Sequence, residues 1–287
     1  MTASRTALIT GANQGLGLAL VEGLAARLGR SDRVLLTGRD ADRVAGAAAA
    51  VPTGGARIEG RVLDVRDPDA IAALADELGE VDIVFSNASA RMSPDADAAD
   101  EVDAVLETSN LATTRMLRAF APRLRPGGRL IVVASALGTL DKLDARVRPR
   151  FAAAAERLDA VDALVGEWRD AVHSGRAQAE GFGSWLNIPS KVAQVAAVRA
   201  IAAERRALDL EHGRLIAALC PGLIDTHASR PWFADMSEAQ TPAQAAAWPV
   251  DLVLNDDVDS EYYGELVQFG KILPWETGAP VPHRAVA

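Results

Sequence analysis

Short apolar runs alternate with longer segments in which apolar residues recur every three or four positions. The short runs predict β-strands at residues 7–10, 34–37, 58–64, 83–86, 130–134, 215–220 and 266–269. The periodic segments predict helices at about 15–28, 40–50, 68–78, 101–123, 188–208 and 237–248. Some strands, such as 130–134, are apolar throughout, which is typical of a sheet covered by helices on both faces. The alternation predicts right-handed βαβ units and a doubly wound, parallel α/β fold of the Rossmann type.

One segment, residues 143–183, departs from this alternation. It predicts two polar-amphipathic helices, at about 147–158 and 160–173, followed by a glycine-containing loop and no strand. An insertion of this length in a compact domain serves as a lid or a packing surface, or it is a structural excursion without chemistry. The chain has no linker rich in Pro, Gly or Ser, so we expect a single domain spanning residues 1–287 that includes the helical insertion.

Composition narrows the possible partners. The formal net charge of −9 disfavours binding to nucleic acid or to an anionic membrane, and no apolar run is long enough to span a bilayer. The single cysteine, Cys220, excludes an intrachain disulfide, and residues 1–5 lack the features of a secretory signal. The histidines show no metal-ligand spacing, so no metal site is predicted. We expect a cytoplasmic protein that acts on a small molecule.

The first predicted strand runs into Thr10-Gly11-Ala12-Asn13-Gln14-Gly15-Leu16-Gly17, and an amphipathic helix begins at once. Glycines at such a turn let the backbone approach a pyrophosphate, whose charge is stabilised by the N–H groups and dipole of the helix. The alternative is an ordinary tight turn. Because the turn joins the first strand and first helix of a βαβ chain, we interpret it as a nucleotide-binding loop.

The end of the second predicted strand indicates which dinucleotide binds. Proteins that bind NAD place an acidic residue there against the ribose 2′-hydroxyl, whereas this chain has Thr37-Gly38-Arg39. Arg39 can pair with a 2′-phosphate, which favours NADP(H), although Asp40 follows it and Gln14 stands where a second cation could help. The alternative is that Arg39 is only a solvated cation at the start of a helix.

Together with later motifs, the glycine loop resembles that of the short-chain dehydrogenase/reductase superfamily. The other matching motifs are Leu63-Asp64-Val65, Ser86-Asn87-Ala88-Ser89 in place of the family's Asn-Asn-Ala-Gly, Asn110 in a helix, Ser135 after the fifth strand, and Cys220-Pro221-Gly222-Leu223-Ile224-Asp225-Thr226. The insertion and the ending Tyr263-Gly264-Glu265-Leu266-Val267 are most similar to the monomeric carbonyl reductases. The cofactor-binding residues this implies are Gly11, Asn13, Gln14, Gly15, Leu16, Gly17, Arg39, Asp64, Val65, Asn87, Ala88, Lys191, Pro221, Gly222 and Thr226.

The family's catalytic motif is Tyr-x-x-x-Lys, and here the lysine aligns with Lys191 and the tyrosine with Asn187. The resemblance implies a catalytic set of Asn110, Ser135, Asn187 and Lys191. An amide can donate a hydrogen bond to a substrate oxygen, but it releases no proton at neutral pH. Loss of a general acid typically costs about 10²–10⁴ in rate, part of which hydrogen-bond donors can retain. Alternatively, Asn187 only caps a helix.

Two other groups could replace the tyrosine as proton source. His227 follows Thr226 and has an unperturbed pKa near 6.5, and Asp141 lies in the loop after Ser135. For each, a solvated surface residue is the alternative. The chain's tyrosines, Tyr262 and Tyr263, lie far downstream of Lys191.

Several functions remain compatible with the sequence. The first is an NADPH-dependent reductase of a carbonyl or of an imine whose nitrogen is already protonated. The others are a non-redox cyclase or isomerase and a catalytically inactive NADP(H)-binding protein. A further alternative is an engineered variant of a family enzyme in which asparagine replaces the catalytic tyrosine. Trp185 and Trp232 flank the expected substrate opening and either pack or contact an apolar substrate. If the insertion covers helices 101–123 and 188–208, we expect a monomer.

Overall fold

The computed structural model of the chain describes residues 4–52, 54–257 and 259–276, so residues 1–3 of the N-terminal segment lie outside the described part. One eight-stranded sheet has the order β3-β2-β1-β4-β5-β6-β7-β8. Its neighbouring strands pair in parallel from β3 to β7, and β8 is antiparallel to β7. The strands are β1 Thr6–Ile9, β2 Arg33–Gly38, β3 Arg57–Val62, β4 Val81–Ser86, β5 Leu124–Val133, β6 Leu215–Leu219, β7 Leu266–Gln268 and β8 Lys271–Leu273.

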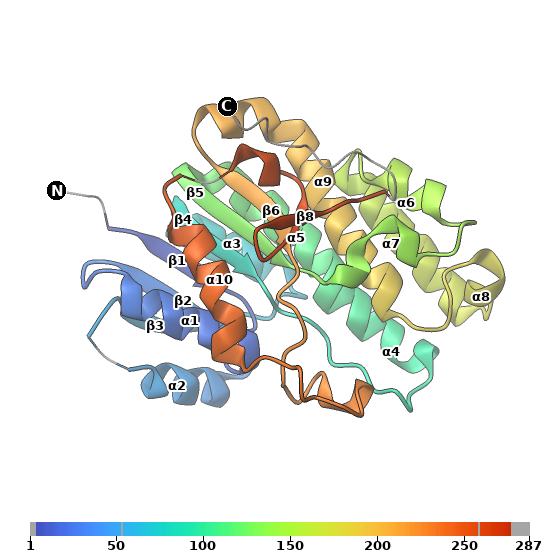
Figure 1. Cartoon of the computed structure of the whole chain (residues 1–287), viewed down its shortest axis with the longest axis horizontal. Helices are drawn as coiled ribbons and strands as arrows, with labels where there is room; N and C mark the ends of the chain where they lie inside the picture. Colours follow the sequence, from blue (N-terminus) through green and yellow to red (C-terminus); the bar gives the residue numbers. More distant parts are fainter. Residues whose placement is uncertain (1–3, 53, 258, 277–287) are drawn as a thin grey trace.

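Helices form a layer on each face of the sheet (Figure 1). One layer holds α1, α2 and α10, and the other holds α3, α5 and α9. The α-helices are α1 Gly15–Arg27, α2 Ala41–Ala50, α3 Pro68–Leu78, α4 Ala98–Val105, α5 Ala112–Phe120, α6 Arg148–Ala154, α7 Leu158–His173, α8 Ala177–Glu180, α9 Asn187–Glu211 and α10 Pro242–Leu254. Every residue of β1 and β6 is buried, as expected for central strands covered on both sides. The predicted doubly wound fold is confirmed.

The predicted strands match the observed ones within a few residues at most ends, but three elements differ more. Strand β5, predicted to begin at 130, begins at Leu124. The antiparallel strand β8 was not predicted, because its three residues are too short to show a pattern. The helix predicted at 237–248 begins later, at Pro242, and ends at Leu254. Thr241 and Gln244 form a capping box that determines this start, and the helix continues through the buried Pro249.

The single helix predicted at 101–123 is divided into four parts. After α4, the backbone forms a π-helical turn, Leu106–Leu111 (η1), then α5, and finally the 3₁₀ turn Ala121–Arg123 (η2). A π-helical turn accommodates one extra residue and commonly lies at a functional site. Asn110, a predicted catalytic residue, lies within this turn and is buried.

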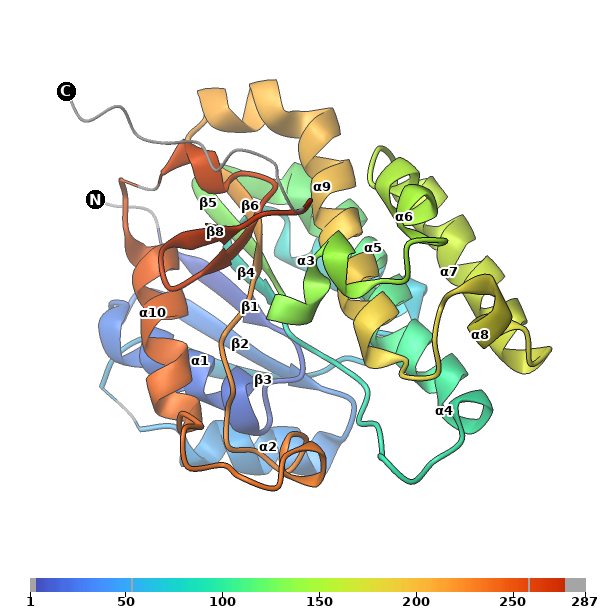
Figure 2. The ribbon, with the colours of Figure 1, turned by 45° about the vertical axis from the view of Figure 1, so that its right-hand side comes forward.

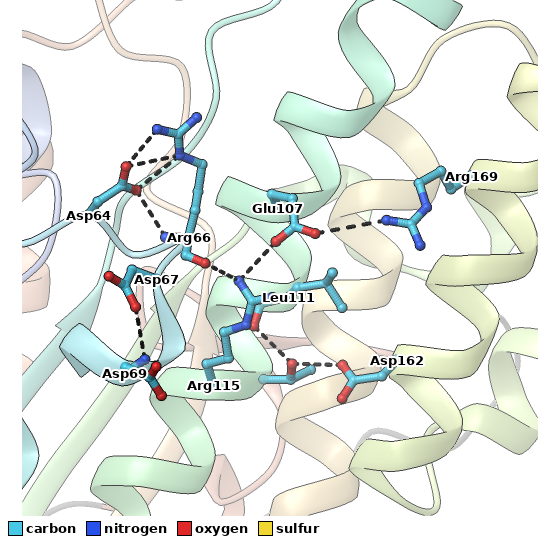
Figure 3. A network of polar contacts seen from close by, with 10 residues as sticks. Asp64, Arg66, Asp67, Asp69, Glu107, Leu111, Arg115, Asp162 and Arg169 are labelled. Atoms are coloured by element: carbon cyan, nitrogen blue, oxygen red, sulfur yellow. Dashed lines mark hydrogen bonds and ion pairs between the residues drawn. The ribbon is translucent and has the colours of Figure 1, made fainter. Parts of the chain in front are cut away.

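The insertion contains three helices, α6, α7 and α8, instead of the predicted two. It packs against α4, the π-helical turn and α9, on the outside of the helical layer (Figure 2). Polar contacts connect α7 to this layer: Arg169 approaches Glu107 at 3.8 Å, and Thr114 donates to Asp162 at 2.7 Å (Figure 3). The insertion is therefore a packed part of the fold. Among the described helices, none is long and apolar enough to cross a membrane.

Candidate functional site

The predicted site residues come together at the carboxyl ends of the parallel strands. In this sheet the strand order reverses between β1 and β4, and ligands of open α/β sheets bind at such a point. The loops after β1 and β4 meet there. Asn87 donates from Nδ2 to the carbonyl oxygens of Thr10 and Gly11 at 2.9 and 3.2 Å, and the amides of Asn87 and Ala88 donate to Thr10 Oγ1.

Close packing in the glycine loop requires the absence of side chains. A Cβ on Gly17 would lie 2.5 Å from the carbonyl oxygen of Gly11 and 2.6 Å from Asn87 Nδ2. Gly11 has a φ of +61°, and a Cβ there would lie 2.8 Å from Ala88 Cα. The first helix therefore begins directly against the two loops, with its N-terminus at the strand ends.

The N-terminus of α1 carries no side-chain cap. Its N-cap residue, Gln14, makes no capping hydrogen bond, whereas the side chains of Asp40, Asp67, Asp97 and Thr241 cap α2, α3, α4 and α10. A Cβ on Gly15 would lie 3.7 Å from the methyl group of Thr226, so the loop after β6 extends over the glycine loop. Uncapped N–H groups at a helix N-terminus suit an anionic ligand such as a pyrophosphate.

Positive charge gathers beside this loop, at the end of β2. Arg39 is exposed, and its charge acts on Asp64, the predicted acidic residue at the end of the third strand. Asp64 pairs with Arg66 at 2.6 Å, and this hydrogen bond lowers the pKa of its carboxyl (Figure 3). Arg43, in the first turn of α2, donates a hydrogen bond to Gln14 Oε1. Arg39, Arg43 and Gln14 together could hold a phosphate on a ribose.

Ser135 follows β5, and its hydroxyl accepts a hydrogen bond from the amide of Leu137 at 3.2 Å. The loop after Ser135 packs on α9, because a Cβ on Gly138 would lie 3.1 Å from the carbonyl oxygen of Lys191. Cys220 follows β6 and lies near Lys191, so that its thiolate form would raise the pKa of that lysine. Burial raises the pKa of the Cys220 thiol, and its sulfur accepts a hydrogen bond from Gln268 at 3.2 Å.

Helix α9 begins at Asn187, which places Lys191 one turn later on the same face. The N-cap residue is Leu186, so the interpretation of Asn187 as a helix cap is wrong. Burial lowers the pKa of Lys191 to about 8. Asn110 attaches this helix start to the π-helical turn: its Nδ2 donates to the carbonyl oxygen of Ser190 at 2.8 Å, and Ser190 Oγ donates to Asn110 Oδ1 at 2.9 Å.

The structure does not favour Asp141 as a proton donor. Lys142 and Thr139 donate hydrogen bonds to its carboxylate, and these lower its pKa. His227 is exposed, and its carbonyl oxygen accepts a hydrogen bond from Arg91 at 3.1 Å. The hydroxyl of Tyr263 donates to the buried Asp209 at 2.7 Å, and that of Tyr262 to the carbonyl oxygen of Gly270. Both tyrosine hydroxyls therefore have partners in the C-terminal part of the fold.

Trp185 and Trp232 lie against each other, with ring centroids 5.6 Å apart. Trp185 precedes the start of α9, and Trp232 lies in the 3₁₀ turn Arg230–Trp232 (η5) after β6. Trp185 is 36% exposed, and the neighbouring Phe233 is 46% exposed. The pair therefore joins two segments that flank Asn187 and Thr226.

Sequence reasoning missed Arg43, Arg91 and Gln194. Arg43 had a usable signal, because it follows Arg39 by four residues and so lies one turn along the next helix. Arg91 had none, since its partner His227 lies in a distant segment. Gln194 had a partial signal, because it lies three residues after Lys191 in the predicted helix, whereas its contacts with Ser109 and Thr113 join distant segments. In the described residues, no group of three or more His, Cys, Asp and Glu side chains could hold a metal ion.

Comparison with known proteins is consistent with this arrangement. The family model of the short chain dehydrogenases matches residues 5–147. Over 284 residues, 27% are identical to "Carbonyl reductase [NADPH] 3" of Rattus norvegicus, a match that covers 95% of this chain and 99% of the rat protein. "Carbonyl reductase [NADPH] 1" of Mus musculus is 25% identical over 284 residues, covering 96% of this chain and 100% of the mouse protein. Residues 5–147 of the chain are thus similar to the short chain dehydrogenase family, and the whole chain is similar to these carbonyl reductases.

Solved structures agree on the fold. Salutaridine reductase from Papaver somniferum superposes with a TM-score of 0.75 at 18% identity, covering 91% of this chain and 99% of that protein. At this identity the likeness concerns the fold alone. It confirms the Rossmann-like, doubly wound architecture predicted from the sequence.

Proposed function

We propose that the chain is an NADPH-dependent reductase of a small-molecule carbonyl or imine, with an amide in place of the family's tyrosine acid. The observation that carries this proposal is the packing of the loop after Ser135 on the start of α9, the helix that carries Asn187 and Lys191, together with the uncapped N-terminus of α1. The similarity to two carbonyl reductases whose names include NADPH supports the cofactor and the reaction class.

The residues present fit NADP(H). The open surroundings of Gly15 and the uncapped N-terminus of α1 suit a pyrophosphate, and the cations of Arg39 and Arg43 suit a 2′-phosphate. Asp64 and Val65 would lie against the adenine, and Asn87, Ala88, Pro221, Gly222 and Thr226 would surround the nicotinamide half. When bound, NADPH supplies the hydride. Lys191 would donate hydrogen bonds to the ribose hydroxyls.

In the substrate pocket, the hydroxyl of Ser135 and the amide of Asn187 would donate hydrogen bonds to the substrate's oxygen or nitrogen. Such donors stabilise charge that develops on a reacting atom, but an amide transfers no proton. A protonated imine needs no proton from the protein, and we therefore favour it over a ketone. Trp185 and Trp232 would contact the apolar part of the substrate.

Replacing Asn187 with tyrosine tests this proposal. In Asn187→Tyr, a phenol one turn from Lys191 would restore the general acid, and we expect the rate of carbonyl reduction to rise by about 10²–10⁴. NADPH oxidation with a panel of ketones and cyclic imines measures this rate. Asn187→Gln, which keeps the amide, is the control and should leave ketone turnover low.

The outcomes separate the candidate functions. Stoichiometric NADPH oxidation by the wild-type protein with an imine supports the reductase. Turnover of a ligand without nicotinamide would instead identify a cyclase or isomerase, and tight NADPH binding with no turnover of any substrate would identify an inactive binding protein. Failure of the wild-type chain to bind NADPH would overturn the proposal. The cytoplasmic location remains a prediction from sequence.

A further inference from the structure

Lys191 is unusual among the lysines of this chain. The sequence contains three, and Lys142 and Lys271 are the others. Lys142 forms an ion pair with Asp141 at 2.8 Å and Lys271 is exposed, whereas the pKa of Lys191 is lowered to about 8 by burial. In the described part of the chain, no carboxylate lies within ion-pair distance of Lys191 Nζ. Burying an ammonium group without a charged partner is costly unless strong hydrogen bonds replace the lost water.

Gln194 provides such a hydrogen bond. It lies three residues after Lys191 on α9, is 1% exposed, and its Oε1 accepts from Lys191 Nζ at 2.8 Å. Its Nε2 donates to the carbonyl oxygen of Ser109 at 2.9 Å and to Thr113 Oγ1 at 3.2 Å. Gln194 therefore joins Lys191 to the π-helical turn that also holds Asn110.

This network determines which way the amide of Gln194 points. Thr113 Oγ1 donates its proton to the carbonyl oxygen of Ser109 at 2.7 Å, so toward Gln194 both Ser109 and Thr113 present only acceptors. The NH₂ group of Gln194 must face these acceptors, and its oxygen must face Lys191. If the amide were flipped, its oxygen would face the oxygens of Ser109 and Thr113. Its NH₂ group would then face the ammonium group of Lys191.

We propose that Gln194 is a positioning residue for Lys191: its oriented side-chain carbonyl fixes the ammonium group near the start of α9 and stabilises its positive charge where no carboxylate is available. Cys220, which follows β6, is the one titratable group in the described structure close enough for its thiolate form to raise the pKa of Lys191. Because its own thiol pKa is raised, Cys220 is neutral near pH 7 and supplies no counter-charge. The proposal deepens the proposed function by naming the residue that positions its lysine.

The chain's few lysines allow a direct test without cofactor. Protein labelled with ¹³C at lysine Cε should give three titrating signals, with Lys142 and Lys271 as internal references. In Gln194→Met, which keeps the side-chain length but removes the acceptor, we expect the Lys191 midpoint to fall by roughly one pH unit. In Gln194→Glu, the added negative charge should raise the midpoint above that of the wild type.

A matched control separates positioning from packing. Val198→Ala removes buried methyl groups one turn farther along α9, so it should lower the melting temperature while leaving the Lys191 midpoint unchanged. A Lys191 midpoint that is the same in the wild type, Gln194→Met and Gln194→Glu would overturn the inference. Opposite shifts in the two Gln194 variants, with no shift in Val198→Ala, would establish it.

A second readout connects this role to the nucleotide. If charged Lys191 holds the ribose, NADPH affinity should fall as the pH rises through about 8, because the ammonium then loses its proton. This fall should begin at lower pH in Gln194→Met and at higher pH in Gln194→Glu. An identical fall in both variants would count against the inference. Absence of NADPH binding by the wild type would instead refute the proposed function, while the NMR titration would still decide the role of Gln194.

Discussion

At the scale of single residues, the glycine loop has no space for a side chain at Gly17. Gly17 lies against the carbonyl oxygen of Gly11, the Asn87 side chain and Ala12 Cα, all within 2.8 Å of the position a Cβ would take. These neighbours are backbone atoms or a side chain that is itself held by two hydrogen bonds. A side chain at position 17 would therefore move the loop after β1, the loop after β4, or both.

We expect Gly17→Ala to lose NADPH affinity by more than tenfold and to lower stability by about 1–3 kcal/mol, the usual cost of overpacking. Nucleotide fluorescence titration and thermal unfolding measure the two effects. Gly46→Ala is the control, because a Cβ at Gly46 on α2 meets nothing within 4 Å. Unchanged NADPH affinity in Gly17→Ala would show that the nucleotide does not use this loop.

Two arginines determine the predicted choice of cofactor. Arg39 and Arg43 are exposed, and Arg43 is held toward the glycine loop by Gln14. A hydrogen bond to a charged group contributes about 1.5–3 kcal/mol, so Arg43→Ala should weaken NADPH binding by about 10–100-fold. NADH lacks the 2′-phosphate, and its affinity should change little.

Titrations of both nucleotides against Arg39→Ala, Arg43→Ala and Arg157→Ala measure this selectivity. Arg157 is exposed at the start of α7 in the insertion and serves as the control. Equal losses of NADPH and NADH affinity in Arg43→Ala would contradict the assignment of Arg43 to the 2′-phosphate. The motif at the end of β2 indicated Arg39 from the sequence, whereas the proposed role of Arg43 rests on its contact with Gln14 in the folded chain.

At the scale of elements, the π-helical turn and the start of α9 form one unit. Asn110 and Ser190 exchange two hydrogen bonds, and each residue is 2% exposed. Ser190 directly precedes Lys191, so this pair sets the position of the lysine's helix relative to α4 and α5. Gln194 provides a second connection between the same two elements, three residues later.

We predict that Ser190→Ala lowers stability by about 1–3 kcal/mol, because Asn110 Oδ1 is then buried without its donor. Chemical denaturation of Ser190→Ala, Asn110→Ala and the double variant should show coupling, with the double variant losing less than the sum of the single losses. Ser237→Ala, at an exposed position, should change stability by less than about 0.5 kcal/mol. Additive losses would show that the two side chains act independently.

The same elements show how far sequence reasoning extends. Apolar runs located the central parallel strands, because strands buried on both faces are apolar throughout, whereas β3 at the sheet edge is partly exposed and mixed in polarity. The π-helical turn was not predicted, since its residues continue the periodicity of the flanking helices. The start of α9 followed from Pro189, which is tolerated in a first helical turn. The contact of Arg91 with His227, and those of Gln194 with Ser109 and Thr113, join segments far apart in the sequence, and no local pattern contains that information.

At the scale of the whole molecule, the insertion covers a surface made of α4, the π-helical turn and α9. Its helix α7 buries Val161, Leu164, Val165 and Trp168, and Arg118 on α5 pairs with Asp159 and Asp162. We propose that the insertion and the sheet form one domain. Because α7 occupies this face, we expect that a second copy of the chain does not pack against α4, the π-helical turn and α9.

We therefore predict a monomer of 30.2 kDa at micromolar concentration, measured by sedimentation or light scattering. Val161→Asp places a charge in the buried side of α7 and should displace the insertion, which exposes the apolar surfaces of the helices beneath and causes self-association. Ala163→Asp introduces the same residue on the exposed side of α7 and should remain monomeric. A stable dimer or tetramer of the wild type would show that association uses another face, and the assignment of α7 as a cover against self-association would then be wrong.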